Sequence, residues 1–390
     1  MKTQTSARSV YVHVPFCRHR CGYCNFSVVA GRDYLADRYL DALHLEMANV
    51  AKEYAFVQQP LEIDTLFLGG GTPSHLDPRQ LQRLADILFR YFRLADNAEV
   101  TAECNPNDIT ADKVHSLQSI GVTRISLGVQ SFAEQKLKHL ERDHTADEVI
   151  TAFQLARSAF SSVSLDLIFA APHETSEAWA VDLRTAISLQ PDHLSTYELT
   201  FEKGTQFWNR LRRGDLHQTD EDLRATMYQW TVQELDRTGW EHYELSSFAK
   251  AGHRCRHNLV YWSGDDYLAF GPGASRFVDG SVRETNHQST SQYLKLVESG
   301  ASPVAHRQSL HGLDAAKEML AIGLRNVDGV GINRFASKSG CSVDDVLGET
   351  KSKLLELDLV EFVTDADHNE RVRLTPEGIM LYDGVAAMIV

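Results

Sequence analysis

No stretch of this 390-residue chain is apolar for long enough to span a bilayer, and its first residues lack the apolar core of a signal peptide. The chain also lacks an excess of basic residues, since 39 Lys and Arg stand against 53 Asp and Glu, giving a formal net charge of −14. Such a chain repels phosphate backbones and anionic lipids, so nucleic acid is not predicted as a partner. We expect a cytoplasmic protein whose thiols stay reduced.

The remaining composition describes a globular protein of more than one part. Hydrophobic residues make up 43% of the chain and charged residues 24%. A length of 390 residues exceeds what a single hydrophobic core usually organises. We predict a large domain over residues 1–240, a connecting segment over 241–305 that closes it, and a small domain over 306–390.

Cysteine is scarce, with six in the chain, yet three are grouped as Cys17-x-x-x-Cys21-x-x-Cys24. An iron–sulfur cluster normally takes four protein ligands, so three leave one iron open for chemistry. A zinc site would need His13 or His19 as its fourth ligand, and a redox pair of Cys21 and Cys24 would not use Cys17. The spacing therefore favours a cluster over zinc or a disulfide. We predict that the other three are buried apolar side chains: Cys104, Cys255 and Cys341.

Apolar, β-branched runs alternate with segments of helical periodicity through the first half of the chain. The runs lie at residues 10–14, 64–68, 98–103, 123–129, 163–169 and 193–199. The periodic segments are Tyr34–Tyr54, Arg79–Phe92, Ala111–Ile120, Thr145–Phe160 and Glu177–Leu189, with Asp77, Thr110 and Thr175 as N-cap candidates. This alternation predicts an α/β fold of six βα units, a curved parallel sheet or incomplete (β/α)6 barrel.

Glycines or polar residues follow several of these runs, at the edge where parallel α/β folds bind ligands. Gly69-Gly70-Gly71-Thr72 would let the backbone approach a ligand and present free N–H groups to a carboxylate or phosphate. Asp166 lies in an otherwise apolar run, so it needs a donor, either Arg142 or a ligand. The other candidates at this edge are Glu103, Gln130 and Arg142. Instead of binding a ligand, these side chains could form a salt bridge inside the barrel or lie at the surface.

Two later segments stand apart from the βα pattern. In Cys255-Arg256-His257-Asn258-Leu259-Val260-Tyr261-Trp262, the imidazole of His257 could bind haem iron and the aromatics could stack on a macrocycle, or all could belong to a domain core. Residues Leu313–Leu324, Val343–Leu357 and Ile379–Ile389 are predicted to be helices that, with a β-ribbon, outline a small winged helix. Its acidic surface favours packing or partner docking over DNA binding.

These motifs together resemble the oxygen-independent coproporphyrinogen III oxidase family of radical S-adenosylmethionine (SAM) proteins, along nearly the whole chain. The resemblance implies that Cys17, Cys21 and Cys24 hold a [4Fe–4S] cluster and that SAM binds its open iron. It also implies a radical SAM partial barrel. The positions that match the family's SAM contacts are Tyr11, Gly70, Gly71, Thr72, Glu103, Gln130, Arg142 and Asp166.

The sequence also distinguishes between two branches of that family. The true oxidases have a further cysteine two places after the third cluster ligand, where this chain has Phe26. Its His257-Asn258-x-x-Tyr261-Trp262 segment instead resembles the haem motif of HemW-type haem chaperones, which implies that His257, Tyr261 and Trp262 contact haem. Two local departures, Ala170-Ala171-Pro172 and Glu141, could alter the floor of the SAM site.

The resemblance implies a haem chaperone that carries a [4Fe–4S] cluster and SAM and passes haem to haem-requiring proteins, including respiratory enzymes at the membrane face. A homodimer is compatible with this function. Two alternatives remain open at this point: a coproporphyrinogen III oxidase or other radical SAM oxidoreductase, and a zinc-stabilised interaction protein.

Overall fold

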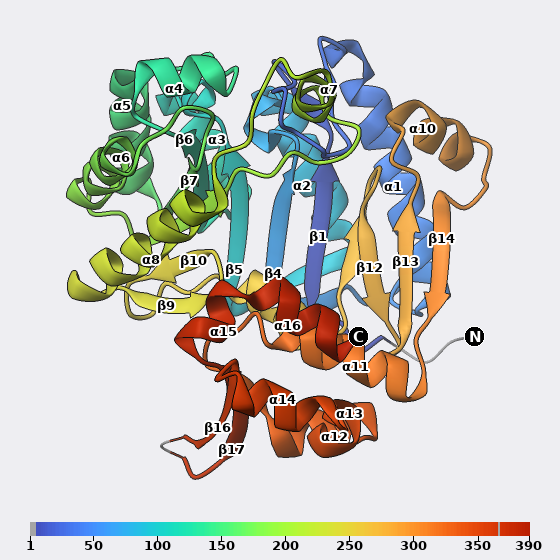
Figure 1. Cartoon of the computed structure of the whole chain (residues 1–390). Helices are drawn as coiled ribbons and strands as arrows, with labels where there is room; N and C mark the ends of the chain where they lie inside the picture. The colour runs from blue at the N-terminus through green and yellow to red at the C-terminus, as the bar shows by residue number, and fades with distance from the viewer. Residues whose placement is uncertain (1–4, 366) are drawn as a thin grey trace.

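The computed structural model describes residues 5–365 and 367–390. Residues 1–4, where the sequence predicts no signal peptide, lie outside this range. A nine-stranded sheet in the order β11-β1-β4-β5-β6-β7-β8-β10-β9 forms the centre of the molecule (Figure 1). The six predicted strands are β1 (Ser9–Val14), β4 (Leu61–Gly70), β5 (Phe92–Cys104), β6 (Arg124–Gln130), β7 (Ser162–Phe169) and β8 (His193–Glu198). They pair in parallel in chain order, so the predicted α/β fold with an incomplete (β/α)6 barrel is confirmed.

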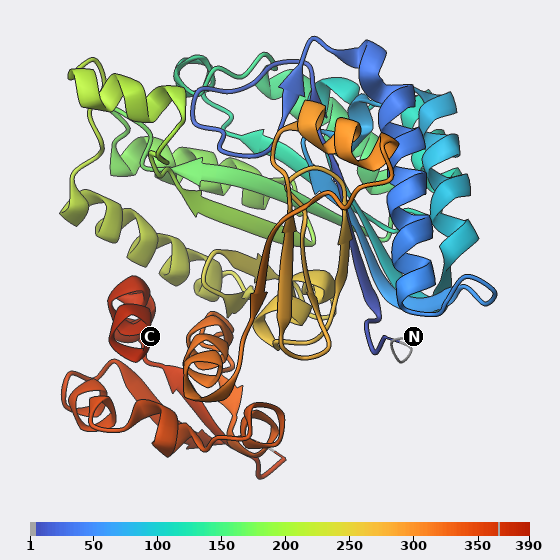
Figure 2. The same cartoon turned by 90° about the vertical axis from the view of Figure 1, so that its right-hand side faces the viewer.

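Helices between these strands cover the outer face of the curved sheet, and α1 and α2 lie side by side on it (Figure 2). The helices of this layer are α1 (Ala36–Glu53), α2 (Pro78–Tyr91), α3 (Ala111–Ser119), α4 (Glu134–His139), α5 (Ala146–Ala159) and α6 (Ser176–Ser188), with α8 (Glu221–Arg237) packed on α6. The helix α7 (Gln206–Arg213) lies instead over the end of the barrel (Figure 1), where the Phe207 N–H donates to the Gly22 carbonyl. Asp77, Thr110 and Thr175 each accept a hydrogen bond from a backbone N–H of the first helical turn, as the sequence predicts. The apolar side chains of sheet and helices form one continuous core.

The segment after α8 extends the barrel sheet and then leaves it. It first forms a hairpin of β9 (Glu241–Glu244) and β10 (Ser247–Ala249), of which β10 pairs with β8. The short helix α9 (Arg256–Trp262) follows, and β11 (Leu268–Phe270) adds to the other edge of the sheet, parallel to β1. A separate antiparallel sheet consists of β12 (Ser275–Val278), β13 (Val282–Asn286) and β14 (Val304–Ser309), with α10 (Thr290–Glu298) before β14.

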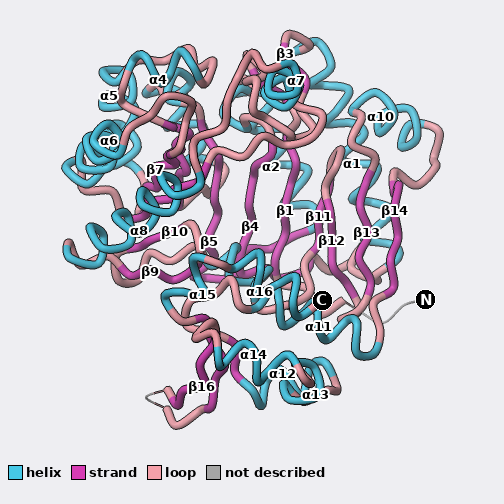
Figure 3. Tube along the Cα trace, viewed as in Figure 1, coloured by secondary structure: helices cyan, strands magenta, loops and turns pink. Residues whose placement is uncertain are grey.

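The C-terminal part packs below the barrel in Figures 1 and 3. Its helices are α11 (Gly312–Gly323), α12 (Ile332–Ser339), α13 (Val343–Leu347), α14 (Thr350–Glu356), α15 (Pro376–Met380) and α16 (Tyr382–Ile389), beside a sheet of β15 (Val330–Gly331), β17 (Glu370–Leu374) and β16 (Val360–Thr364). The predictions of single helices over 343–357 and 379–389 were wrong. The first breaks at Gly348, whose positive φ of 49° does not continue a helix, and the second is interrupted at Leu381. No described helix has the length and apolar character needed to cross a bilayer.

A buried carboxylate ties the first barrel helix to the segment that closes the barrel. Glu46 of α1 accepts hydrogen bonds from the Gly271 N–H at 3.0 Å, the Asn286 side-chain amide at 2.7 Å and the Tyr293 hydroxyl at 2.7 Å. These three donors lie on the β11–β12 turn, β13 and α10, so one side chain positions all of them. Gly271 is required there because a Cβ would lie 2.5 Å from the His13 carbonyl oxygen.

We expect Glu46→Ala to lower the free energy of unfolding by about 3 to 5 kcal/mol, because three buried donors would lose their acceptor. Chemical denaturation followed by circular dichroism measures the change. Asn49→Ala, at an exposed position on the same helix, is the control and should change stability by less than about 0.5 kcal/mol. Equal effects of the two substitutions would contradict a positioning role for Glu46.

Candidate functional site

The loops that follow the parallel strands gather at one end of the barrel, at the top in Figure 3. They enclose a cavity of about 400 Å³, here named the barrel cavity. The predicted residues that line it are Cys17, Cys21, Cys24, Gly70, Gly71, Thr72, Glu103, Gln130, Arg142 and Asp166. Tyr11 lines two neighbouring cavities instead. Most of the predicted cluster and SAM residues are therefore brought together, although they come from six separate segments of the chain.

The three cysteines lie on a loop held at both ends by a short strand pair, β2 (Phe16–Cys17) with β3 (Val29–Ala30). All three are free thiols. The Thr72 hydroxyl donates to Cys17 Sγ at 3.4 Å, and the guanidinium of Arg142 donates to Cys21 Sγ at 3.6 Å. Burial raises the pKa of the Cys17 thiol to about 12 and also raises that of Cys24. Binding of a metal centre would lower these pKa values, since the thiolate is the ligand.

The donor set fits a cluster better than a single ion. Among the described residues, no three His, Cys, Asp or Glu side chains are close enough together to hold one metal ion. The ligand sulfurs of a four-iron cube lie further apart than those around one zinc ion. His13 is not free to complete a zinc site, because it is buried with both ring nitrogens hydrogen-bonded, to the Tyr11 hydroxyl and the Ser27 carbonyl. His19, the other histidine considered from the sequence, lies on the cysteine loop and faces the Glu141 carboxylate at 3.6 Å.

The glycine turn is built for close packing rather than for donating to a ligand. Gly70 has a φ of 100°, and a Cβ on Gly71 would lie 2.6 Å from the Val14 carbonyl oxygen. The N–H groups of Gly70, Gly71 and Thr72 donate to Glu103, Val14 and Phe16. The prediction that this turn presents free N–H groups to a carboxylate or phosphate was therefore wrong, because backbone and carboxylate acceptors of the chain already use them.

Two carboxylates face the cavity, Glu103 from the end of β5 and Asp166 from the middle of β7. Asp166 accepts from the Ser126 hydroxyl at 3.0 and 2.8 Å, so its donor is a serine and not Arg142, the side chain considered from the sequence. Neither carboxylate forms an ion pair with any described residue. Burial raises the pKa of Glu103 to about 8 and raises that of Asp166 as well. A ligand that carries positive charge, as SAM does on its sulfonium and ammonium groups, would stabilise both carboxylates.

Arg142 and Gln130 complete the wall that faces the cysteines. The Arg142 guanidinium donates to the Asn105 side chain at 2.9 Å and to the Gly128 carbonyl at 2.8 Å. Its Nε is buried and has no hydrogen-bond partner among the described residues, which leaves one donor for a ligand. Gln130 has a φ of 66°, an unusual backbone conformation for a residue other than glycine.

The sequence did not identify every residue in this cavity. Asn105, Ser126 and Tyr197 also line it. Ser126 could have been found, because it alternates along β6 with Gly128 and Gln130, the positions that face the barrel interior. Tyr197 follows the apolar part of β8 and carried no comparable signal.

The histidine of the 257–262 segment lies inside the protein. His257 is only 1% exposed, its Nδ1 is 2.7 Å from the Thr65 hydroxyl, and its Nε2 is 2.8 Å from the Tyr261 hydroxyl. Burial lowers the pKa of His257 to about 3, so the imidazole is neutral. Tyr261 and Trp262, in contrast, line a cavity of about 630 Å³ beside the barrel. Haem contact at His257 stays a prediction.

We expect the stability of the SAM-free protein to decline as pH rises from about 4.5 to about 8 through Glu103, because the folded protein keeps a proton that the unfolded chain releases. Glu103→Gln should remove this slope and make the protein more stable than wild type at about pH 8, by roughly 2 to 5 kcal/mol. Chemical denaturation of both proteins at about pH 5 and about pH 8 measures the unfolding free energies. The exposed Glu356→Gln is the control. If the unfolding free energy of Glu103→Gln depends on pH as that of the wild type does, Glu103 is not a buried, unpaired carboxylate.

Comparison with known proteins agrees with this geometry. Residues 11–186 match the Radical SAM superfamily, and residues 310–381 match the HemN C-terminal domain. The chain is 36% identical to Heme chaperone HemW of Bacillus subtilis (strain 168) over 378 residues, which cover 96% of this chain and 97% of the relative. It is 39% identical to Heme chaperone HemW of Escherichia coli (strain K12) over 282 residues, 71% of this chain and 72% of the relative.

A solved structure shows the same fold over almost the whole chain. Coproporphyrinogen III oxidase (HemN) from Escherichia coli superimposes with a TM-score of 0.82 and 23% sequence identity, covering 99% of this chain and 90% of that one. At this identity the likeness defines the fold and not the reaction. The fold, the cysteine loop and the relatives together show that this chain belongs to the HemW family of radical SAM proteins.

Proposed function

We propose that this protein is a cytoplasmic haem chaperone, which binds haem and passes it to haem-requiring proteins, respiratory enzymes at the membrane face among them. The observation that carries the proposal is the helix α9, whose Tyr261 and Trp262 line a cavity next to the barrel. The chain is also similar over 96% of its length to a protein named as a haem chaperone. Haem is the cargo in this proposal, and its partners are the proteins that receive it.

The barrel cavity has a separate role in this account. A [4Fe–4S] cluster bound by Cys17, Cys21 and Cys24 would supply one electron to SAM and allow reductive cleavage of its sulfonium bond. The chain's own residues bind and orient SAM. Glu103 and Asp166 hold the positive charge of the ligand, and the guanidinium of Arg142 donates toward the sulfur of Cys21. The glycine turn brings the backbone close to residues 14–16, which lead into the cysteine loop.

The main alternative is an oxygen-independent coproporphyrinogen III oxidase, since the fold matches that enzyme. One residue of the cluster loop argues against it. Phe26, which stands where the oxidases have a further cysteine, is 59% exposed and offers no sulfur to the chemistry. We therefore favour haem transfer over oxidative decarboxylation of a porphyrinogen.

Anaerobically reconstituted protein distinguishes the two functions. We expect it to bind haem in an absorbance titration with a dissociation constant of about 1 μM or tighter, and to transfer this haem to an apo-haem protein. We expect no conversion of coproporphyrinogen III to protoporphyrinogen IX with SAM and a reductant, with the authentic oxidase as the positive control. Turnover of coproporphyrinogen III, or the absence of haem binding, would contradict the proposal.

A further inference from the structure

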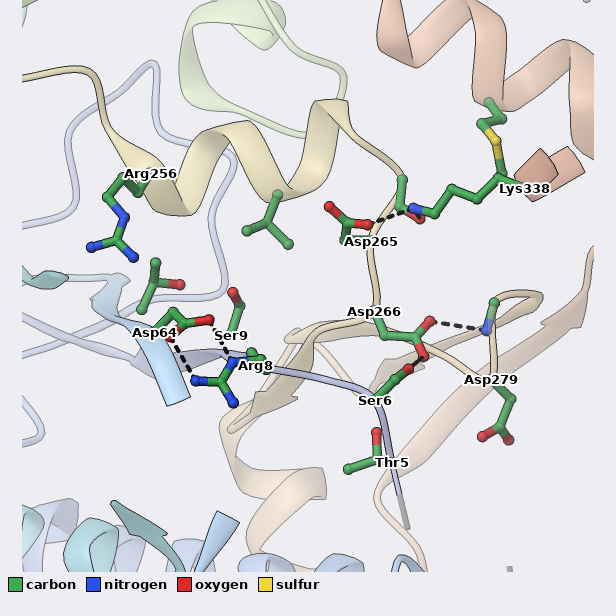
Figure 4. Close-up of a pocket in the computed structure, with 15 residues that line it drawn as sticks. Thr5, Ser6, Arg8, Ser9, Asp64, Arg256, Asp265, Asp266, Asp279 and Lys338 are labelled. Atoms are coloured by element: carbon green, nitrogen blue, oxygen red, sulfur yellow. Dashed lines mark hydrogen bonds and ion pairs between the residues drawn. The ribbon is translucent and has the colours of Figure 1, made fainter. Parts of the chain in front are cut away.

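A polar cavity of about 870 Å³ is lined by residues of both the barrel and the C-terminal part (Figure 4). Arg8 pairs there with Asp64, and Lys338 pairs with Asp265. Each of these four side chains is at least 31% exposed. Exposed ion pairs of this kind contribute little to stability, and their mutual pairing accounts for these four charges without a bound ligand.

A group of three charged side chains outside the barrel cavity is buried instead. Lys136 of α4 donates to Glu174, which follows β7, at 2.5 Å and to Asp182 of α6 at 3.1 Å. Each of the three side chains is at most 8% exposed. They are here named the buried charge group. Charged groups lose their hydration on burial, so such a group persists only where its members are paired and hydrogen-bonded.

The group contains one ammonium and two carboxylates, and donors from two loops complete it. The Ala171 N–H donates to Glu174 at 2.9 Å. Asp182 accepts from the Ser131 hydroxyl at 2.5 Å and from the Phe132 N–H at 2.9 Å. The buried charge group therefore connects the loop that follows β6 to the loop that follows β7.

At the start of each of these two loops lies a residue in a left-handed backbone conformation. Gln130 has a φ of 66° and Ala170 has a φ of 61°. A residue other than glycine keeps such a conformation only where the surrounding structure holds it there. Ser131 and Ala171, which come directly after them, are both donors to the buried charge group. The group thus holds the chain one residue beyond each strained position.

Gln130 connects the buried charge group to the barrel cavity. The described residues that line this cavity include Gln130 but none of the three members of the group. The side chains of Gln130 and Arg142 close over Gly128, where an added Cβ would lie 3.3 Å from Gln130 Nε2 and 3.5 Å from Arg142 Nη2. A shift of the backbone at Gln130 would therefore move one wall of the cavity, while the contact of Cys17 with Thr72 stays in place.

We propose that the buried charge group positions the SAM site: it holds Gln130 at the wall of the barrel cavity and so sets the affinity for SAM without touching it. This inference rests on the proposed function, in which SAM occupies that cavity. It adds three positioning residues, Lys136, Glu174 and Asp182, that no motif of the sequence identified. The group acts on the wall behind the loop after β6 and not on the cysteines that would bind the cluster.

Removal of the ammonium tests the inference. Lys136→Met leaves two buried carboxylates without a cation, so the two loops should shift and SAM binding should weaken about tenfold or more. Lys138→Met is the matched control on the same helix, because its side chain is 72% exposed and pairs with Glu134, and it should keep SAM affinity within about twofold. The measurement is a SAM titration of the full-length, anaerobically reconstituted protein, followed by electron paramagnetic resonance of the reduced cluster. Both variants should retain about four iron per chain.

A double variant separates positioning from a general loss of stability. In Lys136→Met/Glu174→Gln, a neutral amide replaces the surplus carboxylate, and its oxygen can still accept from the Ala171 N–H. We expect SAM affinity to return to within about threefold of the wild type. A merely structural role of Lys136 would lower the melting temperature without a loss of SAM affinity that the second substitution reverses.

If Lys136→Met does not fold, Ser131→Ala gives the same test. This substitution removes the hydroxyl that donates to Asp182 and leaves the ion pairs of Lys136 in place. We expect it to weaken SAM binding about threefold or more, with the iron content unchanged. Thermal melts establish which variants are folded.

The outcomes are distinct. Unchanged SAM affinity in a folded variant that keeps its cluster, or an affinity that the double variant fails to restore, would overturn the inference and leave the proposed function intact. Loss of the cluster together with SAM would also overturn it, because the group would then support the whole barrel. A wild-type protein that binds no SAM would refute the role proposed for the barrel cavity, and the inference with it.

Discussion

Two carboxylates that form no ion pair with any residue the structure describes, Glu103 and Asp166, are the constraint around which the barrel interior is organised. Burial raises the pKa of both, so the empty barrel favours their neutral forms. They lie at the same end of the sheet as the three thiols of the cysteine loop, because parallel strands bring their carboxyl ends to one edge. A cationic sulfonium ligand on a thiolate-bound cluster would satisfy both the carboxylates and the thiols.

The same barrel also fixes the 257–262 segment. Glu99 of β5 accepts from the backbone N–H groups of Arg256 and His257 and so caps the start of α9. Thr65 of β4 then holds the imidazole of His257, which in turn holds Tyr261. The position of Tyr261 therefore depends on two strands of the radical SAM sheet, β4 and β5. The cysteine loop and the 257–262 segment are therefore both positioned by the same parallel sheet.

The sequence predicted the barrel well because its strands are apolar, β-branched runs separated by helices with clear N-caps such as Asp77 and Thr175. The cysteines come directly after the first run, Glu103 ends the third and Asp166 interrupts the fifth, and these positions singled them out as candidates. The sequence did not predict α9, whose seven residues show too little periodicity. The partners of the Gly70–Thr72 N–H groups and of His257 are set by contacts between distant segments, which neither spacing nor composition reports. The helix break at Gly348 depends on a backbone conformation that glycine permits but does not require.

The cluster with a SAM-accessible iron is the central claim, and electron paramagnetic resonance of the reduced, anaerobically reconstituted protein tests it most directly. With about four iron and four sulfide per chain, the spectrum should change when SAM is added, because SAM binds the iron that no cysteine occupies. The change should be lost in Cys21→Ala, which removes one cluster ligand, and retained in Cys341→Ala, a cysteine outside the site. A spectrum that ignores SAM, or a protein that takes up zinc in place of a four-iron cluster, would contradict the account.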